Sequence, residues 1–339
     1  ATQEDVFSAI EPVIYNTFKK FSNKTISEAP FKRITYKEAM IKYGSDKPDL
    51  RNPLFIIDLS EFFNKCTFKP FINRTVRAIK VNGHMSKGFH EKMLDYAMSI
   101  GMGGLGYLEV QADLSFKGPI DKFIPDELKK DLIKIADLQK DDTIFFIADN
   151  EKRATELAGQ IRTELARRLD LIDNSKFEFC WIVDFPMFEI DEHDKIQFSH
   201  NPFSMPQGGL EALENQNPLE ILAYQYDLVC NGIELSSGAV RNHDINIMIK
   251  AFEMAGYTED EVKTKFGALY TAFQFGAPPH AGIAPGVDRI LMLLTDSESI
   301  KEVIAFPLNS KAEDLMMGAP GNVNKDQLRD VHIKVDIKK

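Results

Sequence analysis

The chain reads GAPPHAGIAPGVDRILMLL from Gly276 to Leu294. A strand of small residues passes through Gly286 into an apolar helix that is predicted to begin at Val287, which places Arg289 in its first turn. The helix dipole disfavours a cation there unless an anion binds at the same end. The free N–H groups of a helix N-terminus and a forked guanidinium together suit a phosphate. An ordinary strand, turn and helix with an exposed arginine would also fit this pattern.

Upstream of that stretch, residues 231–241 read NGIELSSGAVR and predict a strand. By strict alternation Glu234, Ser236 and Gly238 share one face of this strand, and Arg241 lies on the other. We therefore expect a bend or bulge at Gly238 that brings Arg241 round to Glu234. The alternative is a surface strand held by a salt bridge.

The third candidate is the loop SHNPF at residues 199–203, in which Pro202 restrains the backbone next to His200. Binding residues are often found on such loops. A lone histidine is more often a surface or satisfied core residue, so the loop by itself leaves the role of His200 open.

A glycine-rich run, Gly101–Gly106, matches the pattern G-x-G-x-x-G. A dinucleotide-binding loop requires a strand before this pattern and a helix after it. Here a helix is predicted before it and a strand after it. The run is therefore interpreted as a turn in which glycine releases the chain from helical geometry.

Composition excludes several classes of protein. The chain has 339 residues, 44% of them hydrophobic and 27% charged, which fits a globular protein of about two domains. Its net charge of −10 argues against a protein covered in positive potential, although a local RNA-binding patch stays open. No apolar run approaches the ~18 residues of a membrane span, and no signal peptide is evident. Three widely spaced cysteines fit neither a disulfide framework nor a zinc site, so we expect a reducing, cytoplasmic setting.

Two helix starts carry cap signals. Thr2 and Asp5 have the spacing of a capping box, and so do Thr35 and Glu38, whose helix is predicted to end at Gly44. The first helix shows one apolar face, made of Phe7, Ile10, Ile14 and Phe18.

Hydrophobic periodicity predicts an α+β unit between residues 58 and 175, followed by a region of strands and Pro/Gly-rich loops. The predicted strands are 75–81, 107–110, 144–148, 177–183 and 304–306. The predicted helices are 89–100, 125–136, 151–169, 244–253, 258–275 and 287–294.

Taken together, these motifs resemble the class II aminoacyl-tRNA synthetases, and Gly286–Arg289 resembles their motif 3. The bacterial-type aspartyl-tRNA synthetases are indicated by three longer stretches: YGSDKPDLR at 43–51, DFPMFE at 184–189 and GAPPHAG at 276–282. This resemblance covers essentially the whole chain.

The resemblance implies an α+β fold, in which an antiparallel sheet flanked by helices is interrupted by a smaller α+β insertion. On this basis residues 1–57 are expected to belong to the catalytic domain, in the part that follows motif 2. Residues 58–175 are expected to form a GAD insertion domain. Residues 176–339 are expected to continue the catalytic domain and to include motif 3.

The resemblance also implies site roles. His200 and Arg241 correspond to residues that bind aspartate, and a planar guanidinium can pair with both oxygens of its side-chain carboxylate. Glu234 corresponds to a glutamate that meets ATP through Mg²⁺, which binds a carboxylate and phosphates together. The remaining ATP-binding positions are Gly286, Val287, Asp288 and Arg289.

The implied activity is that of an aspartate–tRNA ligase, which uses ATP and Mg²⁺. Aspartate attacks the α-phosphate of ATP, and the resulting aspartyl group passes to the tRNA. The expected partners are aspartate, ATP and tRNA(Asp), with tRNA(Asn) left open as a second substrate, and the expected parent enzyme is a homodimer with no membrane association.

The family's anticodon-binding domain, motif 1 and motif 2 should all precede Ala1, so the chain is expected to be a fragment. Loss of one transition-state donor can cost on the order of 10²–10³ in rate. We therefore predict that this polypeptide alone does not form aspartyl-adenylate.

Two other readings stay open: a GAD-containing module that only binds tRNA or a partner, and a synthetase-like paralogue that makes a different aspartate product. Arg241, Glu234 and Arg289 favour the ligase, because a pure binding module has no need of them.

Overall fold

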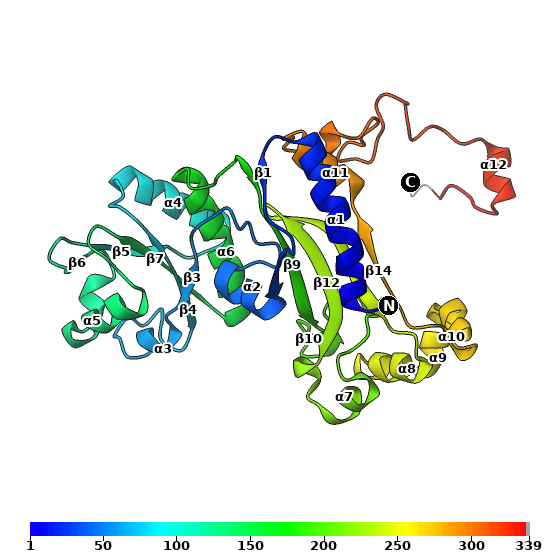
Figure 1. Ribbon diagram of the computed structural model, residues 1–339, viewed down its shortest axis with the longest axis horizontal. Helices are drawn as coiled ribbons and strands as arrows, with labels where there is room; N and C mark the ends of the chain where they lie inside the picture. Colours follow the sequence, from blue (N-terminus) through cyan, green and yellow to red (C-terminus); the bar gives the residue numbers. More distant parts are fainter. Residues whose placement is uncertain (337–339) are drawn as a thin grey trace. The chain divides into compact units, whose positions relative to one another are not determined.

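The structure is a computed structural model that describes residues 1–336. Internal contacts divide the chain into two units, Ala1–Pro285 and Gly286–Lys339. The larger unit contains two five-stranded sheets with helices packed against them (Figure 1). Antiparallel sheets flanked by helices are the α+β architecture that the sequence predicted.

The first sheet is built from segments that are far apart in the sequence. Its strands are β2 (Lys32–Thr35), β9 (Phe179–Pro186), β12 (Leu222–Cys230), β13 (Ile233–Arg241) and β14 (His280–Pro285). The order across the sheet is β14-β13-β12-β9-β2, and all pairs are antiparallel except β2 and β9. The predicted strands at 177–183 and 231–241 are confirmed, although the former is interrupted at Glu178.

Helix α1 (Gln3–Phe21) covers one face of this sheet, and Figure 1 shows it lying across β12 and β14. Its Phe7 ring stacks on Trp181 of β9 with 3.9 Å between ring centroids. The same ring meets Tyr226 of β12 edge-on at 5.1 Å. All three aromatic side chains are buried, and burial of such rings dominates the energetics of a core.

The predicted capping box of α1 is confirmed, whereas α2 has only the Thr35 half of such a box. At the start of α1 the Asp5 N–H donates to Thr2 Oγ1 at 3.3 Å, and the Thr2 N–H donates to Asp5 Oδ2 at 2.7 Å. Helix α2 (Tyr36–Tyr43) begins where Thr35 Oγ1 accepts the Glu38 N–H at 3.1 Å. It ends at Gly44, whose φ of 69° is the left-handed conformation typical of a helix C-terminus.

A buried carboxylate fixes α1 on the sheet. Glu11 is only 7% exposed, and its Oε1 accepts the indole N–H of Trp181 at 2.7 Å. Its Oε2 accepts the main-chain N–H of Phe31, which immediately precedes β2, at 3.3 Å. One side chain therefore connects the helix to two strands.

Replacing Glu11 by leucine should lower the free energy of unfolding by about 2 kcal/mol, because two buried N–H donors would lose their acceptor. Glu11→Gln keeps an amide oxygen and should lose less. The measurement is urea unfolding followed by Trp181 fluorescence. Glu4→Leu is the control: Glu4 pairs with Arg33 of β2 at the exposed surface, where such a pair contributes little, so the change in stability should be less than about 1 kcal/mol. Equal effects of the two leucine variants would contradict the role of Glu11.

The second sheet comes from one continuous part of the chain. Its strands are β3 (Ile56–Asp58), β4 (Thr75–Val81), β5 (Gly106–Val110), β6 (Phe116–Lys117) and β7 (Thr143–Asp149). Their order is β3-β4-β7-β5-β6, with every pair antiparallel. Because β4 and β7 lie in the middle and are covered on both faces, they consist almost entirely of buried residues.

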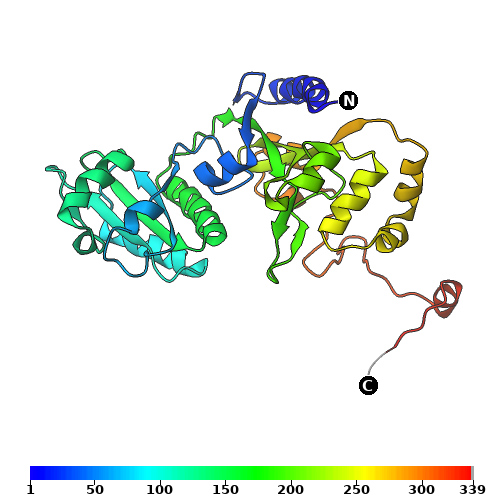
Figure 2. The ribbon, with the colours of Figure 1, turned by 90° about the horizontal axis from the view of Figure 1, so that it is seen from below.

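Helices cover both faces of the second sheet (Figure 2). On one face lie α3 (Ser60–Phe63) and α5 (Asp126–Ile135), and on the other lie α4 (Lys87–Ser99) and α6 (Glu151–Arg168). The strands and helices predicted between residues 58 and 175 are thus confirmed to within about two residues, an uncertainty common at element ends.

The larger unit contains further elements outside its two five-stranded sheets. These are β1 (Thr25–Ile26), β8 (Lys176–Phe177), β10 (Phe188–Ile190), β11 (Ile196–Phe198), α7 (Gly209–Asn215), α8 (Ile245–Met254), α9 (Glu259–Lys265) and α10 (Gly267–Gln274), with short 3₁₀ turns at Asp121–Phe123 and Pro218–Glu220.

The prediction of a single helix at 258–275 is wrong, because the helix breaks at Phe266, whose φ is −125°. The Phe266 ring turns into a cluster with Phe203 and Phe252, at 5.2 and 5.3 Å, and so leaves the helical path.

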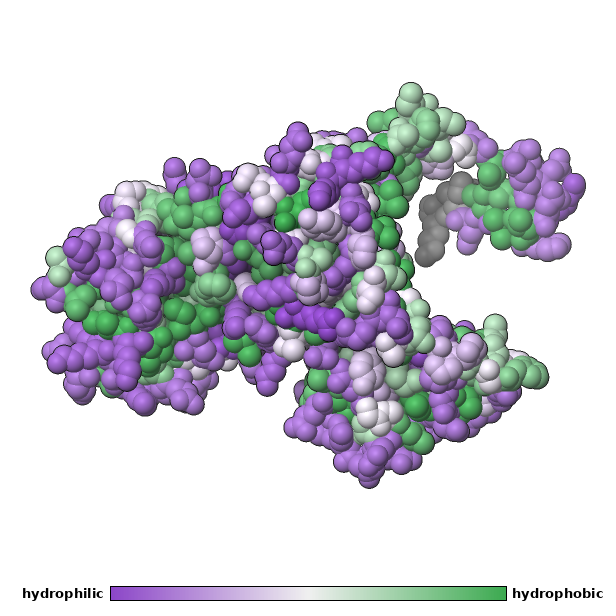
Figure 3. Space-filling model, in the orientation of Figure 1, coloured by the Kyte–Doolittle hydropathy of each residue, from purple (hydrophilic) through white to green (hydrophobic). Residues whose placement is uncertain are grey.

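The C-terminal unit contains α11 (Val287–Leu294), a 3₁₀ turn at Ile300–Glu302 and α12 (Lys325–Asp330). Helix α11 matches its prediction, and none of its residues is buried. The strand predicted at 304–306 is wrong: this stretch is irregular, Phe306 is 52% exposed, and Pro307 follows with no N–H to donate to a sheet. Figure 3 shows apolar residues at the surface of this unit.

Two structural features are absent from residues 1–336. Cys66, Cys180 and Cys230 are buried and form no disulfide. Burial raises the pKa of Cys66 to about 11 and the pKa of Cys180 to about 12, so these thiols are protonated at neutral pH. Within the same residues, every helix is too short or too polar to pass through a lipid bilayer.

Candidate active site

A β-bulge lies in β13, upstream of the position that the sequence predicted. Leu228 of β12 pairs with Ser236, and the next residue, Val229, pairs with Glu234, so Leu235 is the extra residue. One extra residue in a strand reverses the alternation of the side chains beyond it. The bulge is therefore formed at a leucine that is 1% exposed, and not at a glycine.

The bulge turns Glu234 and Arg241 toward the same face of the sheet. Asp227 and Ser237, which pair across β12 and β13, point to that face as well, and the Ser237 side chain hydrogen-bonds the Asp227 carboxyl group. The expected return of Arg241 to the face of Glu234 is thus present. The predicted bulge at Gly238 is wrong, because Gly238 keeps regular pairing with both neighbouring strands.

Gly238 instead permits the close approach of β14. A Cβ atom built on Gly238 would lie 2.6 Å from Cε2 of Tyr226 and 2.9 Å from Cα of Ile283, and it would also clash with the carbonyl oxygen of Gly282. The Tyr226 hydroxyl donates to that same carbonyl at 3.0 Å. The missing side chain therefore lets the edge strand pack directly on the tyrosine.

Charged side chains gather on the face that carries Glu234. The ammonium nitrogen of Lys47 lies 3.1 Å from Asp46 Oδ2 and 3.5 Å from Glu234 Oε2. Partial burial disfavours the charge of Lys47, but Asp46 and Glu234 more than offset this and raise the pKa of Lys47. One ammonium group thus links the loop after α2 to strand β13.

Asp227 is the deeply buried member of this group, with 4% of its surface exposed. Burial raises its pKa to about 7, the hydrogen bond from Ser237 opposes the shift, and the nearby Glu234 and Asp46 add to it. Its Oδ1 atom is buried and has no hydrogen-bond partner among residues 1–336. The sequence interpretation missed Asp227, although an acid inside the apolar strand Leu222–Cys230 was the signal that could have found it.

His200 lies at the edge of the same face. Its ring is edge-on to Phe185 at 4.9 Å and to Tyr36 at 5.7 Å, while part of its surface stays exposed. Partial burial lowers the pKa of His200, although Asp46 and Glu189 act in the opposite direction. The imidazole is therefore neutral at neutral pH and can donate or accept one hydrogen bond at each nitrogen.

Arg241 lines a cavity of about 500 Å³ at the end of β13. Asn201 and Phe203, from the loop that carries His200, line the same cavity, as does His280 of β14. The loop is anchored to β13 by a β-bridge between Ser204 and Arg241. The structure thus brings the His200 loop, Arg241 and Glu234 to one face. The carboxyl groups of Glu234 and Asp227 can bind a cation there, and the guanidinium of Arg241 can bind an anion.

Gly286, Val287, Asp288 and Arg289 belong to the C-terminal unit. Gly286 is the N-cap residue of α11, and the other three form its first turn, as predicted. Their roles toward ATP stay predictions. The glycine run at 101–106 lies between α4 and β5, in the helix-then-strand order that argues against a dinucleotide loop.

The family model described as tRNA synthetases class II (D, K and N) matches residues 1–310. Proteins of Ehrlichia chaffeensis and Rickettsia bellii, both named "Aspartate--tRNA(Asp/Asn) ligase", are 54% and 53% identical over 97% and 98% of this chain. The chain spans 57% of the length of each of these relatives. Among solved structures, one match is the Entamoeba histolytica asparaginyl-tRNA synthetase. The match covers 90% of this chain and 43% of that synthetase, with a TM-score of 0.37 and 15% sequence identity.

Proposed function

The chain belongs to the class II tRNA synthetases of the D, K and N group, and from this premise we propose that it carries part of the active site of an aspartate–tRNA ligase. The names of the relatives at 54% and 53% identity support aspartate as the amino acid. Their names also support tRNA(Asp) and tRNA(Asn) as acceptors. The observation that carries the proposal is the shared face of Arg241, Glu234 and Asp227.

Aspartate recognition is proposed for Arg241 and His200. A guanidinium is permanently charged and presents two parallel N–H donors, which match the two oxygens of the aspartate side chain. The neutral imidazole of His200 can add a hydrogen bond to the bound aspartate. Because it carries no charge, it does not compete with Arg241 for the ligand's side-chain carboxylate. An amide side chain would meet the guanidinium with a mismatched NH₂ group, so asparagine should be rejected.

Magnesium-bound ATP is proposed to meet Glu234 and Asp227. The two carboxylates fit this cation, because Mg²⁺ is commonly held by one or two carboxylates together with phosphates, and Asp227 Oδ1 is a buried oxygen without a protein hydrogen bond among residues 1–336. When bound, the cation neutralises charge on the phosphates. Gly286, Val287, Asp288 and Arg289 are proposed to bind the triphosphate, through the N–H groups of a helix start and one guanidinium.

The residues act by positioning and charge stabilisation, as in other phosphoryl chemistry. The α-carboxylate of aspartate attacks the α-phosphorus of ATP, the bond to pyrophosphate breaks, and aspartyl-adenylate forms. A ribose hydroxyl of the tRNA then attacks the aspartyl carbonyl, and AMP leaves. No side chain of this chain serves as a nucleophile.

The domain organisation is also a proposal. We assign residues 1–57 and 176–339 to the catalytic domain and residues 58–175 to a GAD insertion. The continuous origin of the second sheet supports the insertion, although strand β3 begins at Ile56, two residues before that boundary. The parent protein is proposed to be a cytoplasmic homodimer.

The test is pyrophosphate exchange in a version of the protein extended to the full length of its relatives, which we call the extended protein. Aspartate should support exchange, whereas asparagine and lysine should be slower by about 10³-fold or more. Exchange that is equal with asparagine, or absent with every amino acid, would overturn the proposal.

Asp227 should lower the free energy of unfolding of the protein at neutral pH and above. Because its folded-state pKa of about 7 exceeds the ordinary value of 3.8, ionisation disfavours the folded state, and the cost grows as pH rises from 3.8 to about 7. Asp227→Asn should therefore raise the free energy of unfolding by about 2–4 kcal/mol at about pH 8 and by less at about pH 5, while it weakens Mg²⁺–ATP binding.

Urea unfolding at both pH values measures the effect. Glu192→Gln, at an exposed carboxylate, is the control and should show no such dependence on pH. A destabilised Asp227→Asn protein at the higher pH would contradict this account of the buried carboxyl group.

A further inference from the structure

The loop that carries Asp46 and Lys47 lies between two supports, the hairpin that joins β12 to β13 and helix α6. On the hairpin side, a Cβ atom built on Gly232 would lie 3.4 Å from Cβ of Asp49. On the other side, α6 packs against α2 and the chain that follows it. Since α6 also packs on the second sheet, one helix serves both the second sheet and the candidate site.

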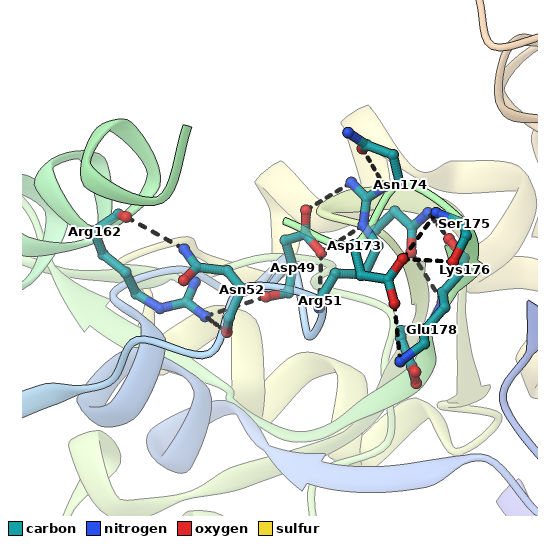
Figure 4. A network of polar contacts seen from close by, with 10 residues as sticks. Asp49, Arg51, Asn52, Arg162, Asp173, Asn174, Ser175, Lys176 and Glu178 are labelled. Atoms are coloured by element: carbon teal, nitrogen blue, oxygen red, sulfur yellow. Dashed lines mark hydrogen bonds and ion pairs between the residues drawn. The ribbon is translucent and has the colours of Figure 1, made fainter. Parts of the chain in front are cut away.

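Arg162 of α6 holds the far end of this loop (Figure 4). Its side chain is 2% exposed, and it donates from Nε to the Leu54 carbonyl at 2.6 Å. From Nη2 it donates to the carbonyl oxygens of Asn52 at 2.9 Å and Asp49 at 3.1 Å. In return, the Asn52 side chain donates to the Arg162 carbonyl at 3.2 Å. These three acceptors of Arg162 are main-chain oxygens, so the bonds fix the path of the backbone.

Burial lowers the pKa of Arg162 to about 10, although Asp49 and Tyr43 partly offset the effect. The guanidinium carbon lies 5.0 Å from the centre of the Tyr43 ring, at the end of α2. A buried cation is expensive, and an apolar side chain could fill the same volume without that expense. The directional hydrogen bonds of Arg162 are what an apolar side chain cannot supply.

Gly159, also on α6, meets the near end of the loop. A Cβ atom on Gly159 would clash with the carbonyl oxygen of Gly44, and a Cβ atom on Gly44 would lie 2.5 Å from the Gly159 nitrogen. The two backbones touch because neither residue has a side chain. Gly159 and Arg162 thus contact the loop on both sides of Asp46 and Lys47.

We propose that Arg162 and Gly159 are positioning residues, which hold the backbone of residues 44–54 so that Asp46 and Lys47 face Glu234. Neither touches substrate; each acts through the loop. The consequence for catalysis rests on the proposed function, whereas the mechanical role of the two residues does not. Through them, the segment that contains the second sheet controls the shape of the candidate site.

The mechanical role is tested by amide hydrogen exchange on the chain itself. In Arg162→Met and in Gly159→Ala, amides of residues 44–54 should exchange at least about 10-fold faster, while amides of β4 and β7 keep their protection. Arg162→Lys keeps the charge and part of the hydrogen bonding and should fall between. Arg167→Met is the matched control, since Arg167 lies on α6 but its side chain bonds, among the described residues, only to Glu164.

The catalytic consequence is tested by aspartate-dependent pyrophosphate exchange in the extended protein. The KM for Mg²⁺–ATP should rise about 10-fold or more in Arg162→Met and in Gly159→Ala, with kcat changed less than about 3-fold, because the loop faces Glu234 and contributes binding geometry and not a reacting group. Arg162→Lys should restore part of the loss. A global loss of folding would lower the amount of active protein and hence kcat, not raise KM.

The outcomes separate the two proposals. Unchanged exchange at residues 44–54 in Gly159→Ala would overturn the positioning role, whatever the enzyme activity is. Faster loop exchange with an unaltered KM would overturn its link to catalysis. No activity in the unmodified extended protein would overturn the proposed function and leave the exchange result intact. If Arg162→Met loses all protection, Gly159→Ala decides the question.

Discussion

Replacing Arg241 by alanine is expected to weaken aspartate binding by about 10²–10³-fold. The side chain lines the cavity at the end of β13, on the face shared by Glu234 and Asp227. Those acids repel the aspartate carboxylate, so the guanidinium has to supply both the attraction and the direction. Alanine would leave the ligand's acid group in a site whose remaining fixed charges on this face are largely negative.

Calorimetric titration of aspartate into the extended protein with a non-hydrolysable ATP analogue measures this loss. Arg241→Lys separates charge from geometry: it keeps the cation but loses the paired donors, so it should recover only part of the affinity. Arg167→Ala, on the exposed face of α6, is the control for a lost surface arginine. Undiminished aspartate binding in Arg241→Ala would show that the residue has another role.

The second large effect is expected at Gly238, where alanine should lower the free energy of unfolding by about 3 kcal/mol. The added carbon would meet the Gly282 carbonyl, Tyr226 and Ile283 together, and two of these contacts are with backbone atoms that cannot rotate away. Strand β14 would have to move off β13, and the hydrogen bond from the Tyr226 hydroxyl to Gly282 would be lost.

Gly282 offers a matched control on the neighbouring strand. A Cβ atom there has no neighbour within 4 Å among the described residues, and its backbone is not in the left-handed region. Gly282→Ala should therefore be neutral or stabilise by about 0.5 kcal/mol, since alanine restricts the unfolded chain. Urea unfolding of the two variants gives the comparison. Equal stability of both would contradict the close packing of β14.

The elements that sequence could predict are those with local causes. The capping box of Thr2 and Asp5 and the left-handed end at Gly44 involve residues within one turn of each other, and both are present. The helix break at Phe266 was not predictable in this way. It depends on Phe203 and Phe252, which lie elsewhere in the sequence and draw the ring out of the helical path.

The candidate site shows the same limit. The motif around Glu234 and Arg241 was visible in the sequence, but the position of the bulge was not, because it depends on pairing with β12. Glycine is the residue that usually signals a bend, and here it marks a close approach of two strands instead. Asp227 and Lys47 were not predicted as site residues, because their proximity to Glu234 depends on how distant parts of the chain pack together.

The segment that forms the second sheet leaves the first sheet and returns to it at neighbouring positions. Arg51, which leads into it, donates to the Asn174 side chain at 3.3 Å, where the chain returns to the first sheet (Figure 4). A domain inserted into a surface loop has this geometry. If the inserted segment were deleted, a short glycine linker could connect its two ends. Such an excision would leave Gly44 and Tyr43 without the helix they rest on. The segment whose two ends lie together, and which a short linker could replace, is therefore also the one whose removal should disturb the loop of Asp46 and Lys47.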